Sequence, residues 1–391
     1  MPEHILFLYA CRWHNDKRTT YRRFGGHMVA KSGGRRTARK PGAKGGVELA
    51  HRCAVIPAKM QGSDGLALAR GELDAILSHV HNGILGTAAK GDVLANLWFI
   101  RAAHEFAVAA TTAAIEPEEK RGHLEFAAKS LLPLSKRIIQ ALISEKGIDG
   151  IWMDDSGLLS GLVVKGKKNP ALQTPLRLNA LWYSALEITG MALRGLTPMG
   201  AAAGLGSGGG KDSSGDHFER LAGRFRRAFT KAYWCEKHQR ICPPALRNET
   251  HGDDHGALPD AEQLLLMILP ESPIPRTKQL GILTQIETQA SGPLGVYVLD
   301  DKGHKVESLV HRAWLAQALG RGAENETQRQ RAVHAARPLE AVAAAARSIG
   351  VHTCYKDGKP LGHVSTVATA EIVATLDRFL HRETAVERLT R

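Results

Sequence analysis

Apolar residues return at helical spacing over most of the chain beyond residue 60. Between residues 131 and 143, for example, Leu131, Leu134, Ile138 and Leu142 recur every three or four positions, which is the period of one face of an α-helix. The pattern predicts a succession of helices over residues 66–80, 91–115, 123–146, 177–196, 216–234, 260–270, 273–290, 306–320, 324–349 and 363–381.

Strand patterns are fewer. GVYVLDDKG, residues 295–303, begins with β-branched and aromatic residues and ends in a turn, and CYKDGK, residues 354–359, carries an Asp-Gly pair typical of a hairpin. Both are interpreted as short excursions between helices. Many helices joined by loops predict an all-α domain, either a solenoid or a closed toroid of alternating inner and outer helices. In a toroid, loops at one end build a pocket on which several helices converge.

Composition divides the chain into a tail and a helical domain. Residues 1–44 hold 11 Lys and Arg against 2 acids, so they supply +9 of the net charge of +13. We predict a basic, disordered tail over residues 1–60 and a helical toroid domain over residues 61–385. Within the domain, residues 197–215 are nearly all small or polar, which predicts a flexible loop. The tail either contacts nucleic-acid phosphates without sequence specificity or has no specific function.

The lengths of the apolar runs and the number of cysteines exclude several classes of protein. No run of about 18 apolar residues exists, so we expect no transmembrane helix, and no cleavage site follows the short apolar run at the N-terminus, so we expect no secretory signal. An odd number of scattered cysteines argues against a disulfide framework and favours a reducing cytoplasm. They are Cys11, Cys53, Cys235, Cys242 and Cys354.

One short segment carries candidate catalytic groups. GIWMDDSGLL, residues 150–159, sets Asp154 and Asp155 beside an aromatic residue and before a glycine turn. Glycoside hydrolysis requires two carboxyl groups: one protonates the leaving oxygen and the other activates water, roughly 6.5–9.5 Å apart in inverting enzymes. The two aspartates are either part of such a site or a polar turn between helices.

Three further segments could bind ligands, and each has a simpler interpretation. THGDDHG, residues 250–256, is more typical of a solvated loop than of a divalent-metal site. Cys235 and Cys242 have no second cysteine pair to complete a zinc site. The glycine-rich residues 204–213 have Asp where a phosphate loop requires Ser or Thr after its Lys. We therefore predict no metal and no cofactor.

The most distinctive segment is LNALWYSAL, residues 178–186, which resembles a segment written roughly INALWYNAL in amylo-α-1,6-glucosidases of the glycogen-debranching type. Seven more segments resemble that family in the same order, so the resemblance covers about residues 66–381. They are NLWFIRAAHEFA (96–107), GIWMDDSGLLSG (150–161), AFTKAYWCEKHQRI (228–241), EQLLLMILPESPI (262–274), GPLGVYVL (292–299), HRAWLAQAL (311–319) and GHVSTVATAEIVATL (362–376).

The resemblance implies an (α/α)6 toroid of the six-hairpin glycosidase type, which the predicted helices would leave one helical pair short. It also implies a substrate class, α-1,6-linked glucose at the branch points of glycogen-like polymers. An amide can both donate and accept a hydrogen bond, and aromatic rings stack on sugars. The substrate-binding candidates are Asn179, Trp182, Tyr183, Gln263 and Trp314; for Trp182, helix packing is an equal alternative.

Polar positions depart from the family pattern. The family's acid lies between the GLL turn and the NALWY helix, where residues 160–177 hold no Asp or Glu, and Cys354 stands where the family's base should be Glu. Arg177 stands in place of Glu, and Asp260 with the following Ala in place of Arg-Pro. The catalytic candidates are therefore Asp154 and Asp155, provided that their turn faces the pocket.

Three functions stay open on this basis. The first is hydrolysis of α-1,6-glucosidic branch linkages in a glycogen-like polysaccharide. The second is a catalytically inactive relative that binds glucan or a protein partner through the same pocket. The third is a helical interaction protein whose basic tail binds nucleic acid.

Overall fold

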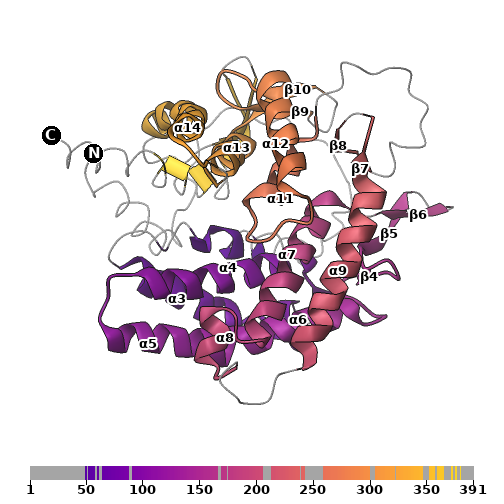
Figure 1. Ribbon diagram of the computed structural model, residues 1–391, viewed down its shortest axis with the longest axis vertical. Coiled ribbons are helices and arrows are strands. Elements are labelled where there is room, and N and C mark those ends of the chain that lie inside the picture. The colour runs from indigo at the N-terminus through magenta and orange to yellow at the C-terminus, as the bar shows by residue number, and fades with distance from the viewer. Residues whose placement is uncertain are drawn as a thin grey trace, which may run out of the picture.

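The computed structural model describes most of the chain beyond residue 48 (Figure 1). The described residues are 49–50, 52–57, 60, 64–87, 90–165, 169–173, 175–205, 213–237, 239–242, 259–299, 304–321, 323–346, 352–356, 359–364, 371–372, 375–376 and 379. Everything said below about the structure refers to these residues.

Helices dominate the described chain. They are α3 (Gly65–Leu77), α4 (Val93–Thr112), α5 (Pro117–Phe126), α6 (Leu132–Ile143), α7 (Leu176–Leu193), α8 (Pro198–Ala202), α9 (Ser213–Tyr233), α11 (Leu265–Ile268), α12 (Arg276–Gln285), α13 (Leu309–Arg321) and α14 (Glu326–Ala346). The π-helical segment η1 (Ala127–Leu131) joins α5 to α6, the 3-10 segment η2 (Ala261–Leu264) leads into α11, and the π-helical segment η3 (Ile286–Ala290) extends α12.

The strands are short and pair antiparallel in small sheets. They are β1 (Val80–His81), β2 (Ile84–Thr87), β3 (Lys90–Gly91), β4 (Ile151–Met153), β5 (Leu159–Lys165), β6 (Asn169–Gln173), β7 (Trp234–Cys235), β8 (Arg240–Ile241), β9 (Val296–Leu299), β10 (Lys305–Ser308), β11 (His352–Lys356) and β12 (Lys359–Val364). The sheet orders are β1-β2-β3, β4-β5-β6, β7-β8 and β12-β11-β10-β9.

Burial separates inner from outer helices. α4, α7 and α13 are buried around most of their circumference because apolar residues occur on nearly all their faces. The outer helix α9 buries Phe218, Phe225 and Phe229 and exposes Arg220 and Arg227. It packs along α7, where the ring centroids of Phe225 and Tyr183 lie 5.3 Å apart. The fold is thus the predicted all-α toroid of alternating inner and outer helices.

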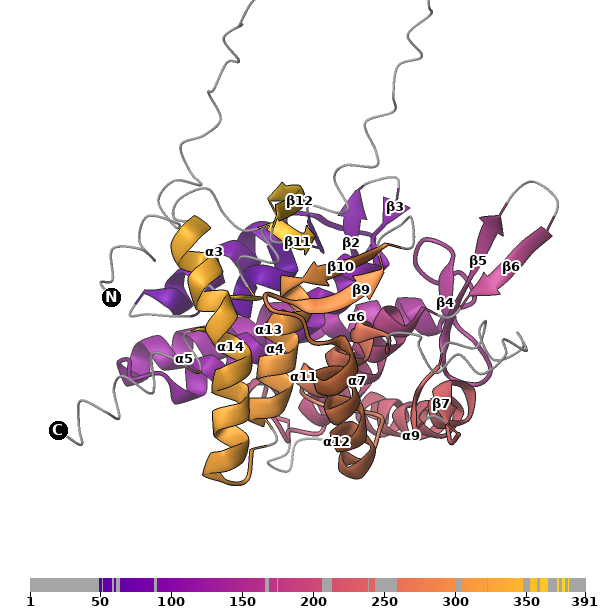
Figure 2. The same cartoon turned by 90° about the horizontal axis from the view of Figure 1, so that it is seen from above.

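The three inner helices begin next to strands. α4 follows β3, α7 follows β6 and α13 follows β10 directly. Figure 2 shows β2, β3 and β9 to β12 gathered on one side of the helices, with β4 to β6 projecting beside them. We call the end of the toroid at which α4, α7 and α13 begin the mouth.

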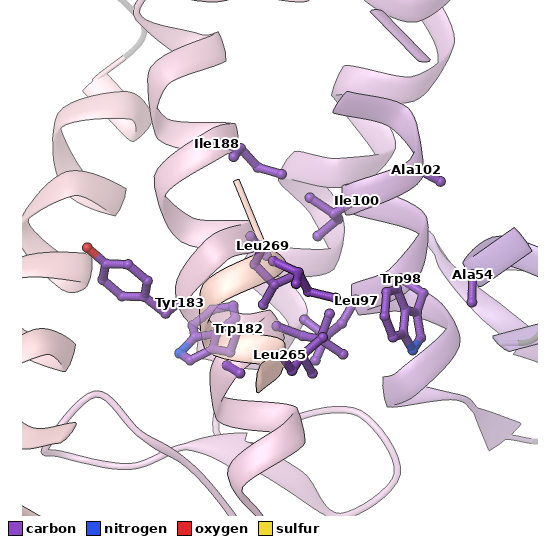
Figure 3. Packing of buried hydrophobic residues seen from close by; sticks show 14 of the residues in the cluster. Ala54, Leu97, Trp98, Ile100, Ala102, Trp182, Tyr183, Ile188, Leu265 and Leu269 are labelled. Carbon is purple, nitrogen blue, oxygen red and sulfur yellow. The ribbon is translucent and has the colours of Figure 1, made fainter. Parts of the chain in front are cut away.

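Side chains from the inner helices fill the centre of the toroid. Figure 3 shows Leu97 of α4, Trp182 of α7, Leu265 of α11 and the adjoining Leu269 meeting between the helices. All four are buried and belong to the main hydrophobic cluster. The space between the described inner helices is therefore filled by apolar side chains and offers a ligand no polar contact there.

Most predicted helices are confirmed within a few residues, because their apolar pattern is local. β9, and the pairing of β11 with β12, confirm the two predicted strand segments. Of the helix predicted at 363–381, residues 371–372 and 375–376 are described as helical. The other strands were missed, because two- to seven-residue strands form through pairing that a local pattern does not reveal.

Two predicted boundaries differ from the described structure. Leu49, Cys53 and Ile56 lie in the main core, so the folded part reaches N-terminal of residue 61, where we expected it to begin. Within the segment 197–215, α8 and the first turn of α9 are helical. No helix among the described residues is both long and apolar enough to cross a membrane.

Candidate functional site

Asp154 organises the turn in which it lies. Its Oδ1 accepts hydrogen bonds from the Ser156 amide (2.9 Å), the Ser156 hydroxyl (2.5 Å) and the Leu158 amide (3.1 Å). Its Oδ2 accepts one from the Ser160 hydroxyl at 2.8 Å. Both oxygens are thus engaged inside an Asx-type turn. Asp155 is exposed on the same turn. This geometry favours the turn interpretation of the predicted catalytic pair.

The turn is seated on two helices through Gly157. Its φ of +94° is a conformation that a side chain rarely adopts, and an added Cβ would lie 3.3 Å from the backbone nitrogen of Phe225 in α9. Its carbonyl accepts a hydrogen bond from the indole nitrogen of Trp182 at 3.1 Å. Trp182 is fully buried, so it packs the helices and supports this turn.

Asn179 is a backbone clamp with no exposed surface. Its Oδ1 accepts from the Leu159 amide at 2.8 Å, and its Nδ2 donates to the carbonyls of Leu159 (3.0 Å) and Pro175 (3.2 Å). It therefore ties the start of β5 to the first turn of α7. With its amide satisfied by backbone groups, it has neither surface nor hydrogen-bonding capacity to offer a sugar.

The same kind of clamp recurs in the inner helix α4 and in the 3-10 segment η2. In α4, Asn96 accepts from the Leu85 amide at 2.9 Å and donates to the Leu85 carbonyl at 2.8 Å. In η2, fully buried Gln263 accepts from the Ile241 amide at 2.9 Å and donates to the Asp260 carbonyl at 2.8 Å. Each amide fixes its helical segment to a preceding strand. Gln263, a predicted substrate ligand, thus has a structural role here.

The two remaining predicted aromatic ligands are also buried. The hydroxyl of Tyr183 donates to Glu187 at 2.8 Å and accepts from Arg226 at 3.0 Å, and burial raises the pKa of Tyr183 above its usual value. Trp314 is 2% exposed and lies edge-on to His311, with ring centroids 5.0 Å apart. Through His311, Trp314 adjoins polar groups at the mouth.

Those polar groups form a cluster that joins three elements at the mouth. Arg177 of α7 donates from Nε to Oε2 of Glu262 at 2.9 Å and makes a second bond from Nη2 to Oε1. Nε2 of His311, in α13, lies 3.6 Å from Glu262 Oε1, and its Nδ1 lies 2.7 Å from the Ser308 hydroxyl. We call Arg177, Asp260, Glu262 and His311 the mouth cluster.

The pKa values of the two carboxyl groups of the cluster are shifted in opposite directions. Burial alone would raise the pKa of Glu262, but hydrogen bonding and the positive charges of His311 and Arg177 lower it to about 2. Burial raises the pKa of Asp260, against the backbone hydrogen bond from Glu262 and the nearby positive charges. Oδ1 of Asp260 accepts that bond from the Glu262 amide at 2.9 Å. The site thus pairs a strongly acidic carboxylate with a weaker acid.

Sequence reasoning did not select Arg177, Glu262 or His311 as functional residues. A signal was present, because Arg177 and Asp260 reverse the charges that the resemblance leads one to expect at both positions. The side chains at 177 and 262 are 85 residues apart in sequence, so their pairing is visible only in the fold.

The other ligand candidates give no further site among the described residues. The segment 250–256 and most of the glycine-rich segment 204–213 lie outside them, as does His238, which stands between the candidate zinc ligands Cys235 and Cys242 in the sequence. In the part of the chain that is described, no group of three or more His, Cys, Asp or Glu side chains is arranged so that it could hold a metal ion. A pocket of about 320 Å³ lies between α6 and α9, lined by Gln140, Ile143, Ser214, His217 and Phe218, and shares no residue with the mouth cluster.

Comparisons with known proteins agree with this architecture. The chain is similar in structure to a GH78 family rhamnosidase of Bacillus sp. GL1, with a TM-score of 0.51 and 13% identity over 84% of this chain and 30% of that one. A GH63 mannosylglycerate hydrolase from Thermus thermophilus gives a TM-score of 0.49 and 10% identity over 84% of this chain and 92% of that one. The chain spans less than a third of the rhamnosidase.

In sequence, the comparison with curated proteins found no match. The likeness to the rhamnosidase shows the fold, that of a six-hairpin glycosidase. A family model described as amylo-alpha-1,6-glucosidase matches residues 93–309, which is more than half of the chain. The matched range contains the three amide clamps and the Arg177–Glu262 pair. The chain belongs to the amylo-alpha-1,6-glucosidase family.

Proposed function

We propose that this protein binds the branched ends of glycogen-like α-glucans at its mouth and does not hydrolyse them efficiently. The observation that carries the proposal is that hydrogen bonds and an ion pair already engage the carboxyl groups of Glu262 and Asp154. Glu262 is held by Arg177 and lies beside His311, and Asp154 uses both of its oxygens inside its own turn. Family membership supports a carbohydrate ligand.

The mouth cluster suits sugar hydroxyls. The side chains of Arg177 and Glu262 are 43% and 26% exposed, so both reach solvent while paired. A guanidinium donates in a fixed fork and a carboxylate accepts, which together match the donor and acceptor character of neighbouring hydroxyls on a pyranose ring. Because these groups already hold one another in place, little side-chain ordering would oppose binding.

Hydrolysis requires a proton donor and a free base, and at the described mouth the Glu262 carboxylate is already engaged by Arg177. A carboxyl whose pKa is about 2 is ionised near neutral pH and cannot protonate a leaving oxygen. Cys354, at the position where the resemblance calls for the basic Glu, has a thiol that is a weak acceptor. Binding without turnover is the function best supported by these two facts.

Hydrolysis stays the second candidate because of Asp260. Its pKa is raised by burial, and a carboxyl that keeps its proton to higher pH is the kind that serves as a general acid. In that case Asp260 would supply the proton and another group would activate water. Asp260 replaces Asp154 and Asp155 as the residue on which this alternative depends.

The proposal is tested by the affinity of the purified full chain for glycogen, measured by affinity electrophoresis. We expect wild-type protein to be retarded, and Arg177→Ala and Glu262→Gln to weaken binding about tenfold, as loss of one charge-assisted hydrogen-bonding group would do. Glu326→Gln, which removes the Glu326–Arg329 ion pair of α14, is the matched control and should bind normally. Equal mobility of wild type in gels with and without glycogen would overturn the proposal.

A glycogen-like ligand also indicates where the protein acts. We infer a cytoplasmic location, which agrees with an odd number of scattered cysteines. Nucleic-acid binding by the N-terminal basic tail would have a different signature, because it would weaken steeply with salt and be lost on removal of residues 1–44.

A further inference from the structure

Two cysteines lie on one face of the β7-β8 hairpin. Trp234 pairs with Ile241 and Cys235 with Arg240, and the Cys242 amide donates to the Tyr233 carbonyl at 2.7 Å, so pairing continues one residue further. Side chains alternate between the faces of a strand. Cys235 and Cys242 are therefore diagonal neighbours on the same face, and Cys235 adds to the raising of the Cys242 pKa that burial causes.

These two thiols differ from the other described cysteines. Both are free and partly exposed. Cys53 has no exposed surface, and burial raises its pKa well above the usual value, so it is expected to be inert. Cys354 lies in β11, in a different sheet from the hairpin. Within the described chain, Cys235 and Cys242 are thus set apart as a neighbouring, accessible pair.

We propose that Cys235 and Cys242 are a site of reversible oxidation, at which a low-molecular-weight disulfide converts the two thiols into an intramolecular disulfide. The thiolate of one cysteine attacks a sulfur of the small disulfide, forming a mixed disulfide and releasing one small thiol. The second cysteine then attacks the protein-bound sulfur and releases the second small thiol. Two protein thiols are oxidised and one small disulfide is reduced to two thiols, which balances the reaction.

The surroundings of the pair set its pH dependence. Burial raises the pKa of Cys242, and the Arg240 guanidinium beside it acts in the opposite sense. Because the thiolate is the nucleophile, the attack is expected to be faster at pH 9 than at pH 7. The hairpin also contacts the mouth, since the Ile241 amide donates to Gln263, the neighbour of Glu262. The oxidation chemistry itself does not depend on whether the mouth binds a glucan.

Peptide mapping after incubation of the native full chain with oxidised glutathione tests the site. Trypsin cleaves after Lys231, Lys237, Arg240 and Arg247, so peptides 232–237 and 241–247 separate unless a disulfide joins them. We expect the joined pair, an intact mass lower by two hydrogen atoms, and reversal by dithiothreitol. Cys242→Ser should instead retain one glutathione on Cys235, and Cys354→Ser should form the joined pair as wild type does.

Three other results of the peptide mapping would contradict the proposal. Two glutathione groups that stay on Cys235 and Cys242 of the wild type would mean that the thiols cannot meet. A joined peptide linking either cysteine to a third one would assign the wrong partner. No reaction at either cysteine, while the urea-unfolded chain reacts at both, would mean that they are not accessible. Any of these outcomes would overturn the proposal.

Discussion

The interior and the mouth of the toroid use neighbouring residues for different purposes. Asn179 and Arg177 lie two positions apart in α7, and Gln263 and Glu262 are adjacent in η2. The two amides are fully buried and bond to the backbone, so they fix helices to strands. The two charged side chains are partly exposed and bond to each other across 85 residues of sequence.

The difference separates residues that hold the fold together from residues that can vary. A buried amide that satisfies backbone groups cannot be exchanged without leaving those groups unpaired, so it belongs to the fold. A partly exposed ion pair is screened by solvent, so a change of its residues costs the fold less than loss of a buried clamp. The segment 178–186 keeps the family pattern while Arg177, immediately before it, reverses the charge. The interior therefore keeps the fold of the family, while residues at the mouth differ from it.

The largest expected effect is at the interior clamp. Asn179→Ala removes three hydrogen bonds and leaves the buried Leu159 amide and carbonyl without their partner, so we expect the free energy of unfolding to fall by about 4 kcal/mol. Arg177→Ala, its partly exposed neighbour, should cost about 1 kcal/mol. Urea denaturation of both variants measures the contrast. Equal losses would erase the distinction between interior and mouth.

A smaller effect is expected when Glu262 of the mouth cluster is protonated at low pH. The pKa of Glu262 is depressed to about 2 in the folded protein, so its contribution to stability is present above the unfolded value of 4.5 and is lost as pH falls toward 2. The depression corresponds to at most about 3 kcal/mol. Urea midpoints of wild type and Glu262→Gln should therefore converge between pH 4.5 and 2. Parallel curves would show that Glu262 is not held as described.

The smallest expected effect tests whether the turn that contains Asp154 is seated on α9. Gly157→Ala places a side chain at φ +94° and close to the α9 backbone, so we expect a loss of about 2 kcal/mol in unfolding free energy. Gly150→Ala also has a positive φ, +73°, but meets nothing within 4 Å, and should cost about 1 kcal/mol. Thermal or urea unfolding compares the two. If Gly150→Ala is the more damaging, the turn is not seated on α9.

Particular residues show how much of the fold and of the site could be predicted from the sequence. The helix predicted at 177–196 is α7 at 176–193, because its apolar residues are a local signal. The two-residue strands were not predictable in this way, since they arise from pairing within tight local hairpins and are too short to show an alternating apolar pattern. The chemistry of Asn179 suits a sugar and a backbone equally, and only burial decides between the two. A hint was available in Asn96, which also stands at the fourth position of an inner helix after a strand.

The most direct test of the central claim is glucose release from a glycogen limit dextrin by the purified full chain, followed between pH 4 and pH 8 beside Asp154→Asn, Asp155→Asn and Asp260→Asn. We predict retention on glycogen with no release above that of the Asp260→Asn variant at any pH. Release by the wild type that Asp260→Asn abolishes, while the two turn variants keep it, would contradict the account and make Asp260 the acid of an active glucosidase.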